Sequence, residues 1–192
     1  MNATIEQAML RDQFIKKDEK VIQWEGANVE KVYVDDIAEH CSEGSMILDV
    51  GAGTAHIAVA VTDKCGKDIE IIALDSSKHL VNIAKKNTRE FKNIAVVRAD
   101  GHKLPFKDSS FDIVMIRLAP HSIIEAHRVL RRGGWYIHYA CGQFNCFKEA
   151  HDIFGNRAEL YCPQDWWKTS WGRLERLDQR GFTEIHEKAF LV

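Results

Sequence analysis

Short apolar runs recur along the middle of the chain and alternate with longer segments in which apolar and charged positions are mixed. The runs cover residues 47–50, 69–74, 94–98, 113–116 and 136–140. Continuous apolar runs of this length are typical of parallel strands that are buried on both faces of a sheet. Their alternation with mixed segments indicates strand–helix–strand units. We therefore predict an α/β fold with a Rossmann-like, doubly wound and mostly parallel sheet.

Helices are predicted between and after these strands, at residues 55–65, 77–91, 121–131 and 144–154. We place the ends of three of these helices at glycines, Gly66, Gly133 and Gly155. A residue with left-handed backbone commonly closes a helix, and glycine adopts that conformation most easily. The second helix is capped at its start by Ser76 or Ser77, whose hydroxyl accepts a backbone hydrogen bond.

The two ends of the chain also carry helical patterns. Residues 1–20 predict one helix, and Asn28 caps a second whose apolar stripe contains Tyr33 and Ile37. Residues 164–178 predict a helix with an apolar face, and a last strand starts at residue 181. Aromatic residues on such helices, Trp24 and Tyr33 included, are more often core residues than pocket residues.

A glycine turn follows the first strand and opens a helix. It contains Gly51 and Gly53, and Asp75 ends the next strand 22 residues after Gly53. Glycine allows a positive φ or the close approach of a ligand, and a carboxylate at that strand end can accept two ribose hydroxyls. The pattern predicts a nucleoside site, with a tight turn that binds nothing as the alternative. His56 stands where a dinucleotide site has its third glycine, which argues against NAD and FAD.

Residues 48–55, Leu-Asp-Val-Gly-Ala-Gly-Thr-Ala, resemble the first motif of the class I S-adenosylmethionine-dependent methyltransferases, of the methyltransferase type 11 kind. In that family the turn cradles the amino acid part of the cofactor rather than phosphates. The chain departs from the family at Ala55, where a third glycine is usual. We expect the extra methyl group to tighten the space near the methionine part without abolishing binding.

Further segments match the family in the same order, from about residue 29 onward. Asp75 matches its ribose-binding acid, and residues 99–101 match the segment whose acid accepts a hydrogen bond from the adenine amino group. Residues 110–116 match the fourth strand, and residues 129–135 match the turn into the fifth. The resemblance implies that S-adenosylmethionine, and its product S-adenosylhomocysteine, contact Asp49, Gly51, Ala52, Gly53, Asp75, Ser76, Asp100, Gly101 and Arg117.

The resemblance also implies how one domain is organised. Residues 1–45 form helices that lie over the cofactor as a lid, and residues 46–192 form the cofactor-binding core. The family adds a final antiparallel strand for which no residues remain after residue 192. The sheet edge is therefore open, completed by a dimer or another partner, or missing because the chain is a piece of a longer protein.

The loop after the fourth strand, residues 117–121, is where the family places contacts to the methyl acceptor. It lacks the Asp or Asn, Pro, Pro, aromatic signature of enzymes that methylate adenine and cytosine amino groups. It is similar to the same region of 23S rRNA guanine-N1 methyltransferases, but the chain lacks their zinc module with paired cysteines. The similarity therefore favours a fold subgroup more than an rRNA substrate.

His121 is the best-placed candidate for a catalytic base, and Arg117 is a candidate clamp for an anion or a carbonyl. Two alternatives involve no chemistry: His121 only caps the following helix, and Arg117 only pairs with a surface acid. Because the sulfonium donor carries the reactivity, orientation and desolvation can supply much of the catalysis without any base.

Composition adds limits to this picture. The chain has 192 residues, of which 45% are hydrophobic, and a formal charge of −2, so it suits one buried core and has no general attraction to nucleic acid or membranes. It has no apolar stretch of membrane-span length and no signal peptide, so a cytoplasmic location is expected. Five irregularly spaced cysteines predict neither disulfides nor a metal site.

Two functional hypotheses follow. The first is an S-adenosylmethionine-dependent methyltransferase that acts on a small molecule, slightly favoured, or on RNA. The second is a nucleoside-binding or regulatory module of the same fold that performs no reaction. Both retain the acids Asp49, Asp75 and Asp100, so these residues do not distinguish the hypotheses.

Overall fold

A single five-stranded sheet organises the part of the chain described by the computed structural model, which covers residues 29–66, 68–139 and 182. All of the elements named here lie in one compact unit, residues 23–139. The strands are β1 (Met46–Val50), β2 (Glu70–Asp75), β3 (Ile94–Arg98), β4 (Phe111–Arg117) and β5 (Leu130–Tyr139). The helices are α2 (Val29–Glu39), α3 (His56–Cys65), α4 (Lys78–Asn87) and α5 (Ile123–Val129).

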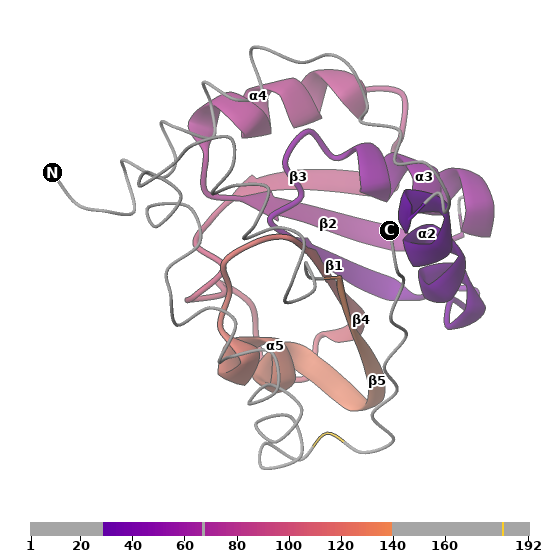
Figure 1. Cartoon of the computed structure of the whole chain (residues 1–192), viewed down its shortest axis with the longest axis vertical. Coiled ribbons are helices and arrows are strands. Elements are labelled where there is room, and N and C mark those ends of the chain that lie inside the picture. Colours follow the sequence, from indigo (N-terminus) through magenta and orange to yellow (C-terminus); the bar gives the residue numbers. More distant parts are fainter. Residues whose placement is uncertain (1–28, 67, 140–181, 183–192) are drawn as a thin grey trace, which may run out of the picture. The chain divides into compact units, whose positions relative to one another are not determined.

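Every strand pair is parallel, and the strands lie in the order β3-β2-β1-β4-β5 (Figure 1). The predicted fold is confirmed. The order reverses at β1, because β2 and β3 extend the sheet on one side of it and β4 and β5 on the other. In doubly wound sheets, ligands bind at the carboxyl ends of the strands beside such a reversal. The carboxyl end of β1 is therefore the first place to look for a site.

The predicted helices in this region are present, with α3 and α4 starting at or within one residue of the expected positions. Ser77, rather than Ser76, caps α4, because its Oγ accepts a hydrogen bond from the Leu80 N–H at 3.3 Å. This helix ends at Asn87, four residues earlier than predicted. Thr88 follows as the C-cap, and its hydroxyl donates to the Ala84 carbonyl at 2.9 Å.

One predicted helix end is wrong. Gly133 does not close α5, which ends at Val129, because β5 already begins at Leu130 with extended backbone angles. Gly133 instead lies inside β5 with a φ of +80°. There the strand register is irregular: Phe111 pairs with Leu130, whereas Ile113 pairs with Trp135. The extra residues of β5 form a bulge, and the left-handed glycine accommodates it.

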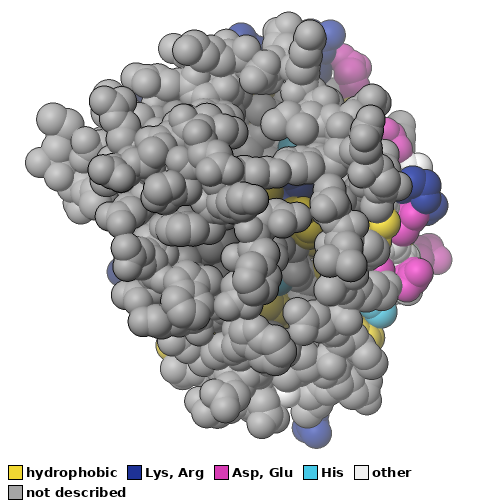
Figure 2. All heavy atoms as spheres, in the orientation of Figure 1, with side chains coloured by type: hydrophobic (Ala, Val, Ile, Leu, Met, Phe, Trp, Pro, Cys, Tyr) yellow, Lys and Arg dark blue, Asp and Glu magenta, His cyan; other side chains and the backbone are white. Residues whose placement is uncertain are grey.

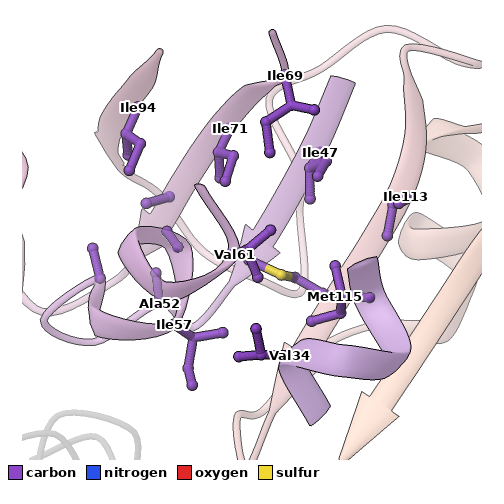
Figure 3. Close-up of a cluster of buried hydrophobic side chains, with 14 of the residues drawn as sticks. Val34, Ile47, Ala52, Ile57, Val61, Ile69, Ile71, Ile94, Ile113 and Met115 are labelled. Atoms are coloured by element: carbon purple, nitrogen blue, oxygen red, sulfur yellow. The ribbon is translucent and has the colours of Figure 1, made fainter. Parts of the chain in front are cut away.

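A cluster of buried hydrophobic side chains lies on the face of the sheet that α2 and α3 cover (Figure 3). Ile47 and Met115 point from the strands toward Val34 of α2 and Val61 of α3. Since side chains alternate along a strand, Asp49, two residues after Ile47, faces the same helices. Asp75 and Arg117 share this face by the same alternation and register. At the carboxyl ends of β1, β2 and β4, polar side chains therefore replace the apolar ones on the face of the sheet that packs against α2 and α3.

The other predicted elements lie outside the described residues. These are the helices at 1–20, 144–154 and 164–178 and nearly all of the strand from residue 181. The final antiparallel strand and a partner at the sheet edge therefore stay predictions. Among the described residues, no helix is long and apolar enough to cross a membrane.

The burial of β1 generates a stability prediction. Ile47 is completely buried, whereas Ile124 on α5 is 52% exposed. Ile47→Ala should lower the free energy of unfolding by about 2 to 5 kcal/mol, because it leaves a cavity among packed side chains. The matched change Ile124→Ala should alter it by less than about 0.5 kcal/mol. Urea denaturation of both variants measures this, and equal losses would contradict the described core.

Candidate functional site

The turn between β1 and α3 has left-handed backbone at every second residue. The φ angles are +75° at Gly51, +59° at Gly53 and +61° at Ala55. The N–H groups of Gly51 and Ala52 donate to the Leu74 carbonyl at 2.8 and 2.9 Å, which ties the turn to the end of β2. Ala55 adopts a conformation that costs an alanine roughly 1 kcal/mol. The usual glycine of the family is therefore replaced where the backbone favours glycine.

Asp75 holds this turn in place. Its Oδ2 accepts a hydrogen bond from the Gly53 N–H at 2.9 Å, and its Oδ1 accepts one from the Ser77 N–H at 2.8 Å. The residue is 8% exposed, whereas its neighbour Ser76 is exposed. Each carboxylate oxygen keeps a second lone pair after these bonds. Asp75 therefore supports the local fold and can still accept donors from a ligand.

Asp49 is a buried acid at the carboxyl end of β1. It is 3% exposed, and its Oδ2 has no hydrogen-bond partner among the described residues. Burial, and secondarily the nearby charge of Asp75, raises the pKa of this carboxyl to about 7, against the smaller opposing effect of Arg117. Burial and then the charge of Asp49 also raise the pKa of the Tyr33 hydroxyl. This end of β1 therefore favours a proton or a bound cation.

Glu30 of α2 reaches the same end of the sheet. Its Oε1 accepts a hydrogen bond from Arg117 Nη2 at 2.7 Å and lies 3.4 Å from Nε2 of His56. The Arg117 guanidinium carbon also lies 5.9 Å from the centre of the Tyr139 ring. Arg117 therefore does pair with an acid, Glu30, whose side chain is 37% exposed, and its role toward a ligand stays a prediction.

Asp100 and Gly101 follow β3 and differ in exposure. The Asp100 side chain is 67% exposed, and hydrogen bonds from the His102 backbone and ring lower its pKa. Gly101 is buried, and a Cβ added there would lie 2.9 Å from both the Pro120 carbonyl oxygen and Val50 Cγ1. Only glycine allows this close contact between the segment after β3 and the loop after β4.

His121 sits beside Gly101 with partners for both ring nitrogens. Its Nδ1 lies 2.9 Å from the Ala119 carbonyl oxygen, and its Nε2 lies 2.7 Å from the Tyr136 hydroxyl. Because a carbonyl only accepts, Nδ1 carries the hydrogen, and in the neutral ring Nε2 accepts from Tyr136. The ring of His138 lies 4.9 Å away, edge to face.

The alternative in which His121 only caps α5 is wrong. Ser122 is the cap, because its Oγ accepts a hydrogen bond from the Glu125 N–H at 3.3 Å. His121 therefore belongs to a polar cluster with Tyr136 and His138, which point to the opposite face of the sheet from Asp49.

The structure brings most of the predicted residues to one end of the sheet. Asp49, the glycine turn, Asp75 and Arg117 surround the carboxyl end of β1, and the loop after β4 connects them to Gly101 and His121. A Cβ on Gly51 would overlap Ala119 of that loop. Ser76 and Asp100 lie at the ends of the neighbouring strands, and no described contact joins them to this group.

Sequence reasoning missed Glu30 and Tyr136. Alternation along β5 identifies Tyr136 as a neighbour of His138 once the strand bounds are known, whereas nothing local in the sequence connects Glu30 to Arg117, 87 residues away. Within the described ranges, no group of three His, Cys, Asp or Glu side chains is arranged to hold a metal ion.

Known proteins are similar to this chain in sequence. A family model of a methyltransferase domain matches residues 47–134. The chain is 33% identical over 124 residues to demethylmenaquinone methyltransferase of Staphylococcus haemolyticus, covering 60% of this chain and 52% of that protein. It is 35% identical over 172 residues to the protein of that name from Staphylococcus saprophyticus, covering 77% and 74%. The chain thus spans about half the length of the first relative and more of the second.

A solved structure agrees with the topology. A SAM-dependent methyltransferase from Aquifex aeolicus matches with a TM-score of 0.59 at 19% sequence identity, and the match covers 78% of each chain. At this identity the likeness supports the fold alone, whereas the Staphylococcus saprophyticus relative matches along most of its sequence. The chain belongs to the class I S-adenosylmethionine-dependent methyltransferases.

Proposed function

We propose that this chain binds S-adenosylmethionine at the carboxyl ends of β1, β2 and β3 and transfers its methyl group to a small molecule. The observation that carries the proposal is Asp49, whose buried Oδ2 has no described partner. A buried carboxylate without a partner is costly unless a cation or a hydrogen-bond donor reaches it. The cofactor has two positive groups, an ammonium and a sulfonium, and its amino acid part suits this end of the sheet.

The glycine turn receives the amino acid part of the cofactor in this proposal. Gly53 supports it, because no atom lies within 4 Å of the position that a Cβ would occupy there. Ala52 and Gly51 present the backbone of the same turn. Arg117 pairs with the cofactor carboxylate in exchange for Glu30, and α2, as part of residues 1–45, acts as a lid over the bound ligand.

The ribose and the base lie along β2 and β3. Asp75 accepts the two ribose hydroxyls with the lone pairs that the turn leaves available, and the exposed Ser76 lies beside it. Asp100 accepts a hydrogen bond from the adenine amino group, and Gly101 keeps the loop close enough to the sheet for the ring to fit. These roles follow the family's order of contacts along the strands.

The acceptor is a phenol of the hydroquinone class. This proposal takes its starting point from the two relatives that carry the name demethylmenaquinone methyltransferase. A quinone ring is electrophilic, whereas its two-electron-reduced hydroquinone is a carbon nucleophile once a phenolic proton has left. The site therefore needs a group that accepts a proton. The chain's formal charge of −2 makes RNA the weaker candidate.

His121 is the proton acceptor, and it acts through Tyr136. Since its Nδ1–H is bound to the Ala119 carbonyl, only Nε2 can accept a proton, and the Tyr136 hydroxyl already donates to that atom. The acceptor's phenolic proton passes to the Tyr136 oxygen while the Tyr136 proton passes to Nε2. The bound cofactor would supply the methyl group and leave as S-adenosylhomocysteine, and the methylated ring carbon would release its proton as the aromatic ring is restored. The Ala119 carbonyl then holds the charged imidazole in place.

Cofactor binding can be tested at two glycines with the same backbone strain. Gly53 has a φ of +59° in the turn, and Gly44 has a φ of +77° before β1; neither has an atom within 4 Å of an added Cβ. Gly53→Ala should weaken S-adenosylhomocysteine binding at least tenfold, because the new methyl group enters the ligand's space. Gly44→Ala should leave affinity unchanged, while both lose roughly 1 kcal/mol of stability. If calorimetry finds the same affinity for S-adenosylhomocysteine in both variants, the proposal that the ligand binds at this turn is contradicted.

The raised pKa of Asp49 predicts opposite pH trends for binding and folding. Cofactor affinity should rise by up to roughly tenfold per unit as pH approaches 7, because the ligand's cations bind the ionised carboxyl. The free energy of unfolding of the ligand-free protein should fall as the pH rises from about 4 to 7. In this range the carboxyl of the folded protein, with a pKa of about 7, still binds its proton, whereas the carboxyl of the unfolded chain, with an ordinary pKa of 3.8, has lost it.

Asp49→Asn should flatten both trends. Adenosine, which has neither an ammonium nor a sulfonium, is the matched ligand and should bind with little pH dependence. Calorimetry between pH 5.5 and pH 8 measures the affinities, and urea denaturation measures stability. An identical pH dependence for adenosine and S-adenosylmethionine would contradict the proposed position of the cations.

The proton relay can be tested with a short-chain demethylmenaquinol and labelled S-adenosylmethionine. His121→Ala and Tyr136→Phe should each lower the methylation rate about a hundredfold or more. The double variant should be no slower than the worse single one, because the two residues act as a unit. His127→Ala, on the exposed side of α5, should leave the rate near that of the unaltered chain.

Measuring cofactor affinity distinguishes loss of the proton relay from disruption of the cofactor site. In all three single variants it should stay within about threefold of the original, because none contacts the proposed cofactor groups. Additive losses in the double variant would contradict the relay. Tight cofactor binding with no methylation of quinols or RNA by the unaltered chain would favour the non-catalytic module instead.

A further inference from the structure

Two thiols meet at the opposite end of the sheet from the candidate site. Cys41 follows α2, and Cys65 is the last residue of α3; both side chains line the same cavity, and the Cys65 thiol is close enough to affect the pKa of Cys41. Both are free and partly buried, and both pack against the core cluster. The residues are distant in sequence, so the contact depends on α2 packing against α3. Nothing in the proposed methyl transfer uses this pair.

Both thiols line a cavity of about 580 Å³. Its wall includes residues before β1 and β2, which places it at the amino ends of these strands. The charged side chains that face it are Asp35, Glu39, Glu43, Lys64 and Asp68. Among the described residues of its wall, acids therefore outnumber the single lysine, and Figure 2 shows acidic side chains gathered along the edge where α2 and α3 lie in Figure 1.

The lysine does not neutralise the remaining acids. Lys64 Nζ lies 3.0 Å from Asp35 Oδ1, and Lys31 also pairs with Asp35 at 2.6 Å. Within the described part of the chain, Glu39, Glu43 and Asp68 form no ion pair, so their charges act on the cavity. A negatively charged cavity attracts small cationic molecules and repels anionic ones.

We propose that Cys41 and Cys65 form an oxidisable dithiol site that reacts with small cationic or neutral disulfides and discriminates against anionic ones. Cys65 thiolate attacks one sulfur of the external disulfide, and one thiol leaves. Cys41 then attacks Cys65 Sγ of the mixed disulfide, and the second thiol leaves. The protein loses two hydrogens and two electrons, the reagent gains them, and a Cys41–Cys65 disulfide joins α2 to α3.

We assign the first attack to Cys65 because the surroundings of Cys41 disfavour its thiolate. Burial, and then the hydrogen bond to Cys65 and the repulsion of its charge, raises the pKa of the Cys41 thiol. Cys41 therefore stays protonated while Cys65 attacks, and it becomes the resolving residue. Since acids surround the pair, the reaction should speed up with rising pH and, for a cationic reagent, slow down with added salt.

Three disulfides of similar size and different charge provide the test: cystamine, 2-hydroxyethyl disulfide and dithiodiglycolate. Each is added to the full chain at low ionic strength, and peptide mapping by mass spectrometry follows the Cys41–Cys65 cross-link. Each rate is divided by the rate for the chain unfolded in urea, which removes the intrinsic reactivity of the reagent. Cystamine should exceed dithiodiglycolate at least tenfold, with 2-hydroxyethyl disulfide between them. Equal normalised rates would overturn the charge selectivity.

Variants test the pair and the acids separately. Cys41→Ser should accumulate a mixed disulfide on Cys65, whereas Cys65→Ser should react much more slowly at Cys41. The triple change Glu39→Gln, Glu43→Gln and Asp68→Asn should reduce the preference for cystamine to less than about threefold.

Thermal unfolding provides a readout that does not depend on reaction rates. The cross-link closes a loop of moderate length and should raise the Tm by roughly 5 to 10 °C, a rise that dithiothreitol reverses. A folded chain that yields no Cys41–Cys65 cross-link, or one whose cross-link lowers the Tm, would overturn the proposal. The double change Cys41→Ser and Cys65→Ser is the control, and it should show no shift with cystamine.

Discussion

The carboxylate of Asp75 is the contact on which the arrangement of the site depends. It joins the N–H of Gly53 in the first turn to the N–H of Ser77 at the start of α4, so one side chain fixes the ends of two βα units. Buried charge-assisted bonds of this kind are stronger than neutral ones. The acid that the family pattern assigns to ribose therefore also holds the glycine turn in place. Replacing it changes the shape of the site as well as its hydrogen bonding.

The sheet divides the chemistry of the site between its two faces. Asp49, Asp75 and Arg117 continue the rows that face α2 and α3, whereas Tyr136 and His138 face the side of α5. A cofactor placed across the carboxyl ends of the strands would have the buried acids on one side and the His121 cluster on the other.

The strands could be predicted from the sequence, because short continuous apolar runs are typical of strands that are buried on both faces of a parallel sheet. It also located the glycine turn and the acids at the strand ends, since the backbone requirements of such a turn are local; the roles of the acids toward a ligand stay predictions. The end of α5 was not predictable, because Gly133 suits a helix end and a β-bulge equally, and only pairing with β4 distinguishes them. The Glu30–Arg117 pair was not predictable either, since it depends on where α2 packs.

That pair bears on how a ligand enters. In the described structure Arg117 already has a carboxylate partner, so a ligand carboxylate adds no new ion pair; it exchanges one for another. Such an exchange contributes little net affinity, because the pair that is lost offsets the pair that is gained. In the proposed site, discrimination then comes from the buried end of β1, where Asp49 Oδ2 has no hydrogen-bond partner among the described residues. The ion pair at the surface joins α2 to the end of β4, and in the proposed site the buried acid selects the ligand.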